Sequence, residues 1–399
     1  MYDRVSKNVF VGDEGGYFHR VASATGATTT SLQLDFGTGL VQSPVLDQTR
    51  GLVYVFASSD GTANCAAGVA CSAVYLLSTT FAANTSGTEV TVGNSVVNGT
   101  LPNPNPLYIG GFDSTYYNTV GGTGNLYVCG NTGAGPTLYR VPISAGAFGT
   151  VAPVAALTPA ANKPSCSPVT DFSIPNASGA NSEHVFFSVQ NNGLPTPCGP
   201  PPGKGCMMNF VDTPWQASTH YNAGQEIMVL RTANNTLYIN VAIVAGTTAA
   251  TAPVWPAGAG AKQVDGGVTW LNQRFTGASA LAPWAPNRSF GFRARIFDGT
   301  NVEIATLTAF TGATTPTWNT TVGGNTTDGA MIWINAGPWP NAALVATSGT
   351  GGIIIDNSVG SGTLAGASQV YFFTLGNQLC STSGGTGGCA MQASQSTLQ

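Results

Sequence analysis

Few side chains in this sequence could carry acid–base or metal chemistry. Only three histidines occur among its 399 residues: His19, His184 and His220. No two of them have the HExxH spacing with which a helix binds zinc. A phosphate-binding loop and a nucleophile elbow are also absent from the sequence. The sequence therefore predicts no metal site, no cofactor and no catalytic centre built on histidine.

Carboxylates at a recurring position are the next candidates. Each of four aspartates ends a short apolar segment: Asp3, Asp47, Asp171 and Asp356. Two carboxyl groups brought together could cleave a glycoside as acid and base. A repeated aspartate is, however, typical of a turn in which the carboxylate accepts hydrogen bonds from its own backbone, and we expect that structural role. The acidic loop 12–16 is likewise interpreted as a hairpin turn rather than a cation site.

The eight cysteines predict disulfides and an extracellular location. Three pairs are close in sequence and lie in loops rich in small residues: Cys65 with Cys71, Cys198 with Cys206, and Cys380 with Cys389. Cys129 and Cys166 are left and are paired by elimination, although eight cysteines formally allow 105 pairings. Zinc is the alternative, but these spacings and the scarcity of histidine do not suit a structural zinc site.

Two further features bear on export. Seven Asn-x-Ser/Thr sequons are candidate glycosylation sites: Asn84, Asn98, Asn176, Asn234, Asn287, Asn319 and Asn325. They agree with an exported chain, although a sequence rich in Asn and Thr contains several by chance. No signal peptide is visible before the first strand-like segment. An exported chain would then come from a longer precursor, or its numbering starts late.

Composition excludes several classes of protein. Only 8% of the residues are charged, 43% are hydrophobic, and the chain has 52 Gly and 24 Pro. A coiled coil needs a different composition, and a disordered chain would be less apolar. The net charge of −4 without a basic cluster argues against nucleic-acid binding. No apolar segment approaches the ~20 residues that span a bilayer.

Short β-branched and aromatic runs recur in a pattern of three strands. The five copies cover 2–3, 8–11 and 17–20; 43–47, 52–56 and 73–77; 107–109, 125–128 and 137–140; 167–171, 184–188 and 207–210; and 353–356, 369–373 and 390–392. Fourth strands are expected at 31–34 and 89–92. Repeats of three or four antiparallel strands are the signature of propeller blades. We therefore predict an all-β fold, a β-propeller with about five recognisable blades.

Residues 213–337 interrupt this rhythm and contain a duplication. Pro-x-Trp and Asp-Gly-x-x-x-Trp motifs recur with an offset of 63 residues, and a preceding Trp recurs with an offset of 69. The predicted domains are thus the first part of the propeller (1–212), two small inserted β modules (213–278 and 279–337) and the closing blade (338–399).

The inserted motif, an aromatic residue and Gly followed by Pro-x-Trp and Asp-Gly-x-Val-x-Trp, resembles the small β modules of bacteriophage tail-fibre proteins. It resembles more distantly the chitin-binding modules of secreted glycosidases. That resemblance implies carbohydrate binding by Trp215, Tyr221 and Trp255, whose rings would stack on sugar faces. The other interpretation, which we favour, makes these rings the cores of two small domains.

The Gly-, Thr-, Ala- and Asn-rich style of the whole chain resembles that of large exported bacterial surface proteins. The sequence thus predicts a secreted structural or adhesive surface protein. It would be the subunit of an extracellular filament in which subunits complete each other's sheets by strand complementation. A carbohydrate-binding surface protein acting through the inserted modules is the alternative, and a propeller glycosidase or lyase is the third hypothesis. The predicted partners are other copies of the chain and a glycan.

Overall fold

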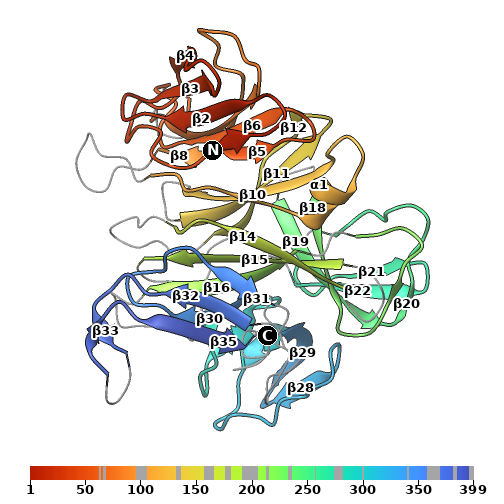
Figure 1. Ribbon diagram of the computed structural model, residues 1–399. Helices are drawn as coiled ribbons and strands as arrows, with labels where there is room; N and C mark the ends of the chain where they lie inside the picture. Colours follow the sequence, from red (N-terminus) through yellow and green to blue (C-terminus); the bar gives the residue numbers. More distant parts are fainter. Residues whose placement is uncertain are drawn as a thin grey trace. The chain divides into compact units, whose positions relative to one another are not determined.

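The computed structural model describes residues 1–62, 64–65, 69–95, 106–131, 136–156, 166–175, 181–190, 205–212, 215–231, 236–256, 258–273, 282–298, 301–338, 341–356, 369–380 and 384–394. Among these residues the only helix is the single turn and a half of α1 (Ser114–Asn118), and the other elements are strands. The predicted all-β fold is confirmed (Figure 1).

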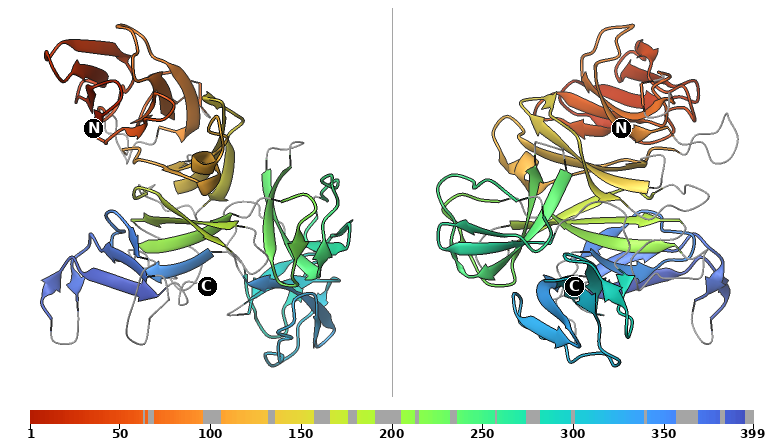
Figure 2. Two further views of the ribbon diagram at one scale, coloured as in Figure 1. Left: turned by 45° about the vertical axis from the view of Figure 1, so that its right-hand side comes forward. Right: turned by 180° about the vertical axis from the view of Figure 1, so that it is seen from behind.

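The chain forms two compact units. Unit 1 contains residues 1–172, 185–209 and 343–399, and unit 2 contains residues 173–184 and 210–342. Figure 2 shows the strands of both units from two further directions, with unit 2 mainly in green and cyan. The predicted modules at 213–278 and 279–337 lie within unit 2.

Four strands in sequence order make the first sheet of unit 1: β1 (Tyr2–Asp3), β2 (Asn8–Gly12), β3 (Tyr17–Ala22) and β4 (Thr28–Gln33). The second sheet repeats this plan with β5 (Val45–Asp47), β6 (Leu52–Ala57), β7 (Cys71–Ser78) and β8 (Thr88–Asn94). We call these the first and second repeat sheets. Both include the fourth strand that the sequence predicted.

The third repeat sheet contains β9 (Gly111–Phe112), β10 (Gly124–Asn131), β11 (Pro136–Ser144), β12 (Ala147–Phe148) and β13 (Ala152–Ala156). Its first strand was predicted at 107–109, and this was wrong. Leu107 belongs to no strand, and its apolar side chain is buried in a core. The strand lies further along the chain, where Phe112 pairs with Leu126 of β10. One parallel pair, Asn131 with Gly93, joins this sheet to the second.

The fourth repeat sheet has the order β14-β15-β16-β30 and consists of β14 (Thr170–Pro175), β15 (Asn181–Val189), β16 (Cys206–Asp212) and β30 (Asn341–Val345). Most of unit 2 is therefore inserted between the third and fourth strands of this sheet. The fifth repeat sheet has β31 (Ile354–Asp356), β32 (Gln369–Phe373) and β35 (Ala390–Ser394), with a hairpin of β33 (Gln378–Leu379) and β34 (Thr386–Gly387) before β35.

Neighbouring repeat sheets pack through alternate side chains of their second strands. Val53 and Val55 of β6 belong to a core shared with Phe10 of the first sheet. Tyr54 and Phe56 point to the opposite face, into a core shared with the third sheet. Because strand side chains alternate between faces, each inner sheet buries both. Closure of the sheets into a propeller stays a prediction, since the described residues form no closed ring of strands.

Unit 2 contains the two modules of the duplication. The first has β17 (His220–Tyr221), β18 (Glu226–Arg231), β19 (Thr236–Val244), β20 (Gly246–Thr247), β21 (Lys262–Asp265) and β22 (Val268–Asn272). The second has β23 (Ala282–Pro283), β24 (Ser289–Phe290), β25 (Arg295–Phe297), β26 (Asn301–Ala305), β27 (Ala309–Phe310), β28 (Asn325–Asp328) and β29 (Met331–Pro338). Each module pairs its strands in the same order apart from the added β23.

Equivalent apolar residues of the two modules pack against each other. Val241 and Leu271 of the first module share one buried core with Ile304 and Ile334 of the second. Each pair is separated by 63 residues, the repeat offset of the sequence. The two modules therefore form one body, because each buries equivalent residues of its sheet against the other module.

Candidate functional site

Asp3, Asp47 and Asp356 each end the first strand of a sheet, whereas Asp171 lies inside β14 and not at a turn as the sequence predicted. The segment after Asp356 lies outside the described residues. The carboxylate of Asp3 accepts hydrogen bonds from the backbone nitrogens of Val5 (2.9 Å) and Ser6 (3.0 Å). Asp113, which follows β9, caps α1 by accepting from the backbone nitrogen of Tyr116 at 2.8 Å. The third repeat therefore has its own turn aspartate, which the misplaced first strand concealed.

Asp47 combines this turn role with charged and aromatic partners. Its carboxylate accepts from the Arg50 backbone (3.1 Å), the Arg50 guanidinium (2.8 Å) and the Tyr116 hydroxyl (2.6 Å). Burial alone would raise the pKa of Asp47, but the hydrogen bonds from Tyr116 and Arg50 bring it below its ordinary value. An ionised, fully bonded carboxylate is suited to holding the turn and not to donating a proton.

The acidic loop at 12–16 is the β2–β3 hairpin turn. The backbone nitrogen of Asp13 donates to the Tyr17 carbonyl at 3.0 Å. The Asp13 carboxylate accepts from the Tyr17 nitrogen at 2.8 Å and lies 2.9 Å from Nε2 of His19. The two side chains thus bind each other across the hairpin. In the part of the chain that the structure describes, no group of three potential metal ligands occurs.

A cavity of about 310 Å³ lies in unit 1 where the repeat sheets begin. Gln42 precedes β5, Tyr108 precedes β9, Ser167 precedes β14 and Thr350 precedes β31, so equivalent segments of four successive repeats line this cavity. The lining contains hydroxyl, amide and glycine groups but neither a carboxylate nor an imidazole. Such a lining can hydrogen-bond a neutral polar ligand, and it lacks the paired carboxyl groups of a glycosidase.

The hydroxyl groups of this cavity are linked to each other. Ser167 Oγ accepts from the backbone nitrogen of Ser188 at 2.8 Å, and Ser188 Oγ accepts from the backbone nitrogen of Thr350 at 2.8 Å. The Thr350 hydroxyl lies 2.9 Å from the same Ser188 oxygen. These bonds connect the fourth and fifth repeat sheets, which gives the hydroxyl groups a structural role.

The aromatic residues proposed to bind sugar lie in the core of the first inserted module. Tyr221 is 0% exposed and Trp255 is 8% exposed. Trp215 is half-buried and donates its indole N–H to Asp265 at 2.7 Å, as does Trp270 at 3.1 Å. In this arrangement the rings of Tyr221 and Trp255 offer no free face on which a sugar could stack.

Four of the seven sequons lie within the described residues. Asn84, Asn287 and Asn325 are exposed, and Asn319 is half-buried. The Asn319 side chain accepts from the backbone nitrogen of Thr321 and donates to the Asn325 carbonyl. Asn98, Asn176 and Asn234 lie outside the described residues.

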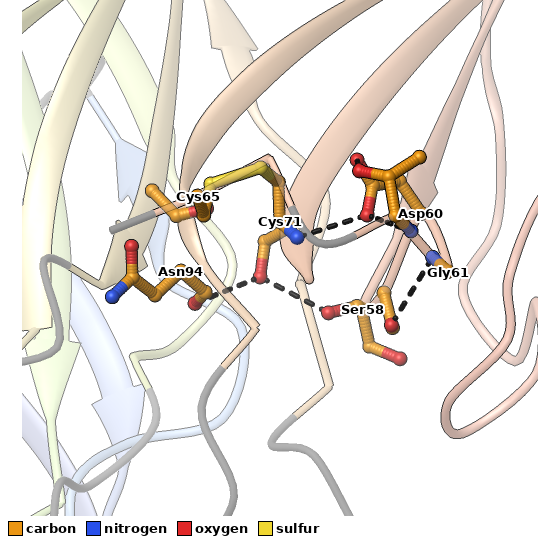
Figure 3. The surroundings of a disulfide bond; sticks show 10 residues. Ser58, Asp60, Gly61, Cys65, Cys71 and Asn94 are labelled. Atoms are coloured by element: carbon orange, nitrogen blue, oxygen red, sulfur yellow. Dashed lines mark hydrogen bonds between the residues drawn. A yellow bond between two sulfur atoms is a disulfide. The ribbon is translucent and has the colours of Figure 1, made fainter. Parts of the chain in front are cut away.

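Three disulfides have both cysteines within the described residues, and each joins cysteines that the sequence analysis paired: Cys65–Cys71, Cys129–Cys166 and Cys380–Cys389. Cys206 is also disulfide-bonded, and Cys198 lies outside the described residues. Figure 3 shows the surroundings of the first bond. The backbone nitrogen of Cys71 donates to the Asp60 carboxylate at 2.9 Å, and this hydrogen bond anchors one end of the disulfide. Cys129 belongs to β10 and Cys166 pairs with Val189 of β15, so the second bond joins two neighbouring repeat sheets.

The outermost sheets of the repeat series each leave an apolar face exposed. In the first sheet this face contains Tyr2, Val9, Val11 and Tyr17, which we call the first-sheet face. In the fifth sheet it contains Ile354, Tyr371 and Phe373, which we call the fifth-sheet face. Sequence reasoning missed both faces. The shared register of the second strands, in which Val9 and Val11 correspond to the buried Val53 and Val55, was the signal that could have found them.

No protein-family model, no curated protein and no solved structure matches this chain.

Proposed function

We propose that this chain is a secreted structural or adhesive surface protein that self-assembles into an extracellular filament. Its disulfides agree with an oxidising compartment. No helix among the described residues is long and apolar enough to cross a membrane. With only 8% charged residues, contact between copies meets little electrostatic repulsion or desolvation cost.

The observation that carries this proposal is the open edge of the fifth repeat sheet. The first, second and fourth repeat sheets have a fourth strand, supplied by β4, β8 and β30, whereas the fifth has the order β31-β32-β35 among the described residues. Among the described residues no strand pairs with the outer edge of β35, and the backbone donors and acceptors of such an edge are a template for another strand. Strand complementation places a strand of the next subunit there.

We further propose that the five repeat sheets are the blades of a propeller-like body. In four of the five sheets a first strand of two or three residues ends at or directly before an aspartate, and in all five the second and third strands are neighbours of at least five residues. The fourth sheet departs from this pattern, because its first strand is the longer β14 with Asp171 near its start. The equivalent segments that line the cavity of unit 1 fit the inner ends of blades.

Electron microscopy and sedimentation of the purified chain across a concentration series test self-assembly. We expect filaments whose length grows with protein concentration. A chain that stays monomeric at all concentrations, with its disulfides formed, would reject the proposal.

Two proline variants test the β35 edge itself. Consecutive residues of a strand direct their N–H groups to opposite edges, so Met391→Pro and Gln392→Pro differ in which edge they disturb. The variant that keeps the wild-type melting temperature has lost only an outward N–H, and we expect it to shorten or abolish the filaments. Filaments of normal length with that variant would rule out strand addition at β35.

A further inference from the structure

We infer that the fifth-sheet face of one subunit packs against the first-sheet face of a second copy of the chain, which repeats between molecules the packing of neighbouring sheets within one molecule. The inference rests on the proposed self-assembly, and it names the surfaces that meet.

The turn aspartates set a common register for the second strands. Asp3 is paired with Asn8, Asp47 with Leu52, and Asp356 with Gln369. Counting from these partners, the first and third positions that follow are occupied by Val9 and Val11, by Val53 and Val55, and by Val370 and Phe372. The second position is occupied by Phe10, Tyr54 and Tyr371, and the fourth by Gly12, Phe56 and Phe373.

These positions have fixed directions in the second repeat sheet. Its first and third positions, Val53 and Val55, pack toward the preceding sheet. Its second and fourth positions, Tyr54 and Phe56, pack toward the following sheet. In the third sheet Leu126 follows the partner of Asp113 and is buried in the core shared with the second sheet, as this rule requires.

The same register explains which faces stay uncovered. In the first sheet Val11, at the third position, is 46% exposed. In the fifth sheet Phe373, at the fourth position, is 50% exposed, while Val370, at the first position, is fully buried. Each exposed face therefore has the side chains that would pack against the other.

The two faces have the chemistry of a contact between sheets. Tyr2 is 45% exposed and Ile354 is 68% exposed. His19, which also lies on the first-sheet face, is bonded to Asp13 and Thr30. The ring of Phe373 lies against Gly351, where a Cβ would collide with it. Apolar groups held on the surface of an exported protein in this way are typical of a docking surface.

A second copy is the occupant because the two faces are different, lie on the same chain and, being exposed, do not cover each other within one molecule. A contact between unlike faces is heterologous, and it leaves the complementary face free at each end. Such a contact extends without limit unless its rotation closes a ring. It therefore produces the filament of the proposed function, whereas a contact between like faces would stop at a dimer.

Two charge variants and their mixture test this pairing. Val11→Glu disables the first-sheet face and Phe373→Glu disables the fifth-sheet face, and each is expected to weaken self-association about 100-fold or more. Each variant alone should sediment as a monomer. An equimolar mixture should form one-to-one heterodimers and nothing longer, because each variant retains the face that its partner lacks.

The controls are exposed apolar residues outside both faces. Val120→Glu and Phe310→Glu alter side chains that are 100% and 61% exposed, and they should assemble like the wild-type chain. Circular dichroism checks that each variant is folded. If Val11→Glu or Phe373→Glu fails to fold, Tyr2→Glu and Ile354→Glu replace them on the same faces.

The outcomes separate the two proposals. Wild-type filaments that persist with both face variants would reject the face pairing and leave self-assembly intact. Variants that are monomeric alone but form no heterodimer when mixed would also reject the pairing. A monomeric wild-type chain would reject both proposals together.

Discussion

Asp265 and Asp328 organise the cores of the two inserted modules. Each carboxylate is buried and accepts two indole N–H groups, from Trp215 and Trp270 in the first module and from Trp284 and Trp333 in the second. Each also accepts one backbone N–H, from residues 249 and 312. These residues recur with an offset of 63, or of 69 for the first Trp, and the repeat therefore reflects one hydrogen-bonded core built twice.

Replacing the central carboxylate should destabilise unit 2. Asp265→Ala leaves two indole donors and one backbone donor without their acceptor in a buried site. Unsatisfied buried groups of this kind cost about 1–3 kcal/mol each, so we expect a loss of about 3 kcal/mol or more. Denaturant unfolding followed by tryptophan fluorescence measures it. Lys262→Ala, an exposed change in the same strand, should have little effect, and equal stability of the two variants would contradict this account.

Glu303 should make unit 2 less stable as the pH rises. Burial, with repulsion from Asp298, raises the pKa of Glu303 from 4.5 to about 8. Between these values the unfolded chain releases a proton that the folded chain retains, so unfolding becomes more favourable with increasing pH.

The variant Glu303→Gln removes this effect. Its melting temperature should vary less between pH 5 and pH 8 than that of the wild-type chain, and it should exceed the wild-type value at pH 8. Glu14→Gln, an exposed change, should keep the wild-type pH dependence. A parallel pH profile for Glu303→Gln would show that Glu303 does not titrate in this range.

At the scale of the elements, two disulfides should differ in their contribution. Cys65–Cys71 closes a separation of 6 residues within one repeat sheet, whereas Cys129–Cys166 closes 37 residues and joins two sheets. The loop-entropy relation gives about 2 kcal/mol for the shorter loop and about 4 kcal/mol for the longer.

Alanine pairs at each bridge test this order by denaturant unfolding. The Cys129→Ala, Cys166→Ala variant should lose more free energy of unfolding than the Cys65→Ala, Cys71→Ala variant. The reverse order would mean that anchoring of the hairpin by Asp60, rather than loop length, decides the stabilisation.

Strand positions were predictable where alternation and turns agreed. The second strands, such as Leu52–Ala57, combine β-branched and aromatic residues with a preceding turn aspartate, and they formed as expected. The first strand of the third sheet was predicted too early in the chain, because the apolar side chain of Leu107 packs in a core although Leu107 belongs to no strand. β30 was missed because its neighbour β16 lies more than 120 residues earlier, a separation that no local pattern reports.

The candidate surfaces were less predictable than the elements. Whether Tyr221 stacks on a ligand or fills a core depends on neighbours such as Trp270, which only the fold brings within ring contact. The cavity of unit 1 likewise collects single residues, such as Gln42 and Tyr108, from segments that have no shared motif. The exposed end faces depend on which repeats have a neighbour, which is a property of the whole series.

At the scale of the whole molecule, unit 1 should fold and assemble without the two inserted modules of unit 2. Its cores are built from its own repeat sheets, and β16 and β30 are neighbours in one sheet. Replacing residues 213–340 by a short Gly-Ser linker should therefore give a folded chain with a cooperative melting transition. Because both end faces belong to unit 1, this variant should form filaments at the wild-type concentration. Loss of cooperative melting would show that the insertion is needed for folding.

The position of that insertion also determines how long after β16 the ribosome synthesises β30. A ribosome adds about 5–20 residues each second, so roughly 130 residues delay β30 behind β16 by about 6–25 s. During this interval the nascent fourth sheet has three strands, and the margin of β16 that will pair with β30 is unpaired. The inserted modules, which lie between β16 and β30 in the sequence, can already fold. A chaperone or export factor that shields this margin would be needed only until β30 emerges.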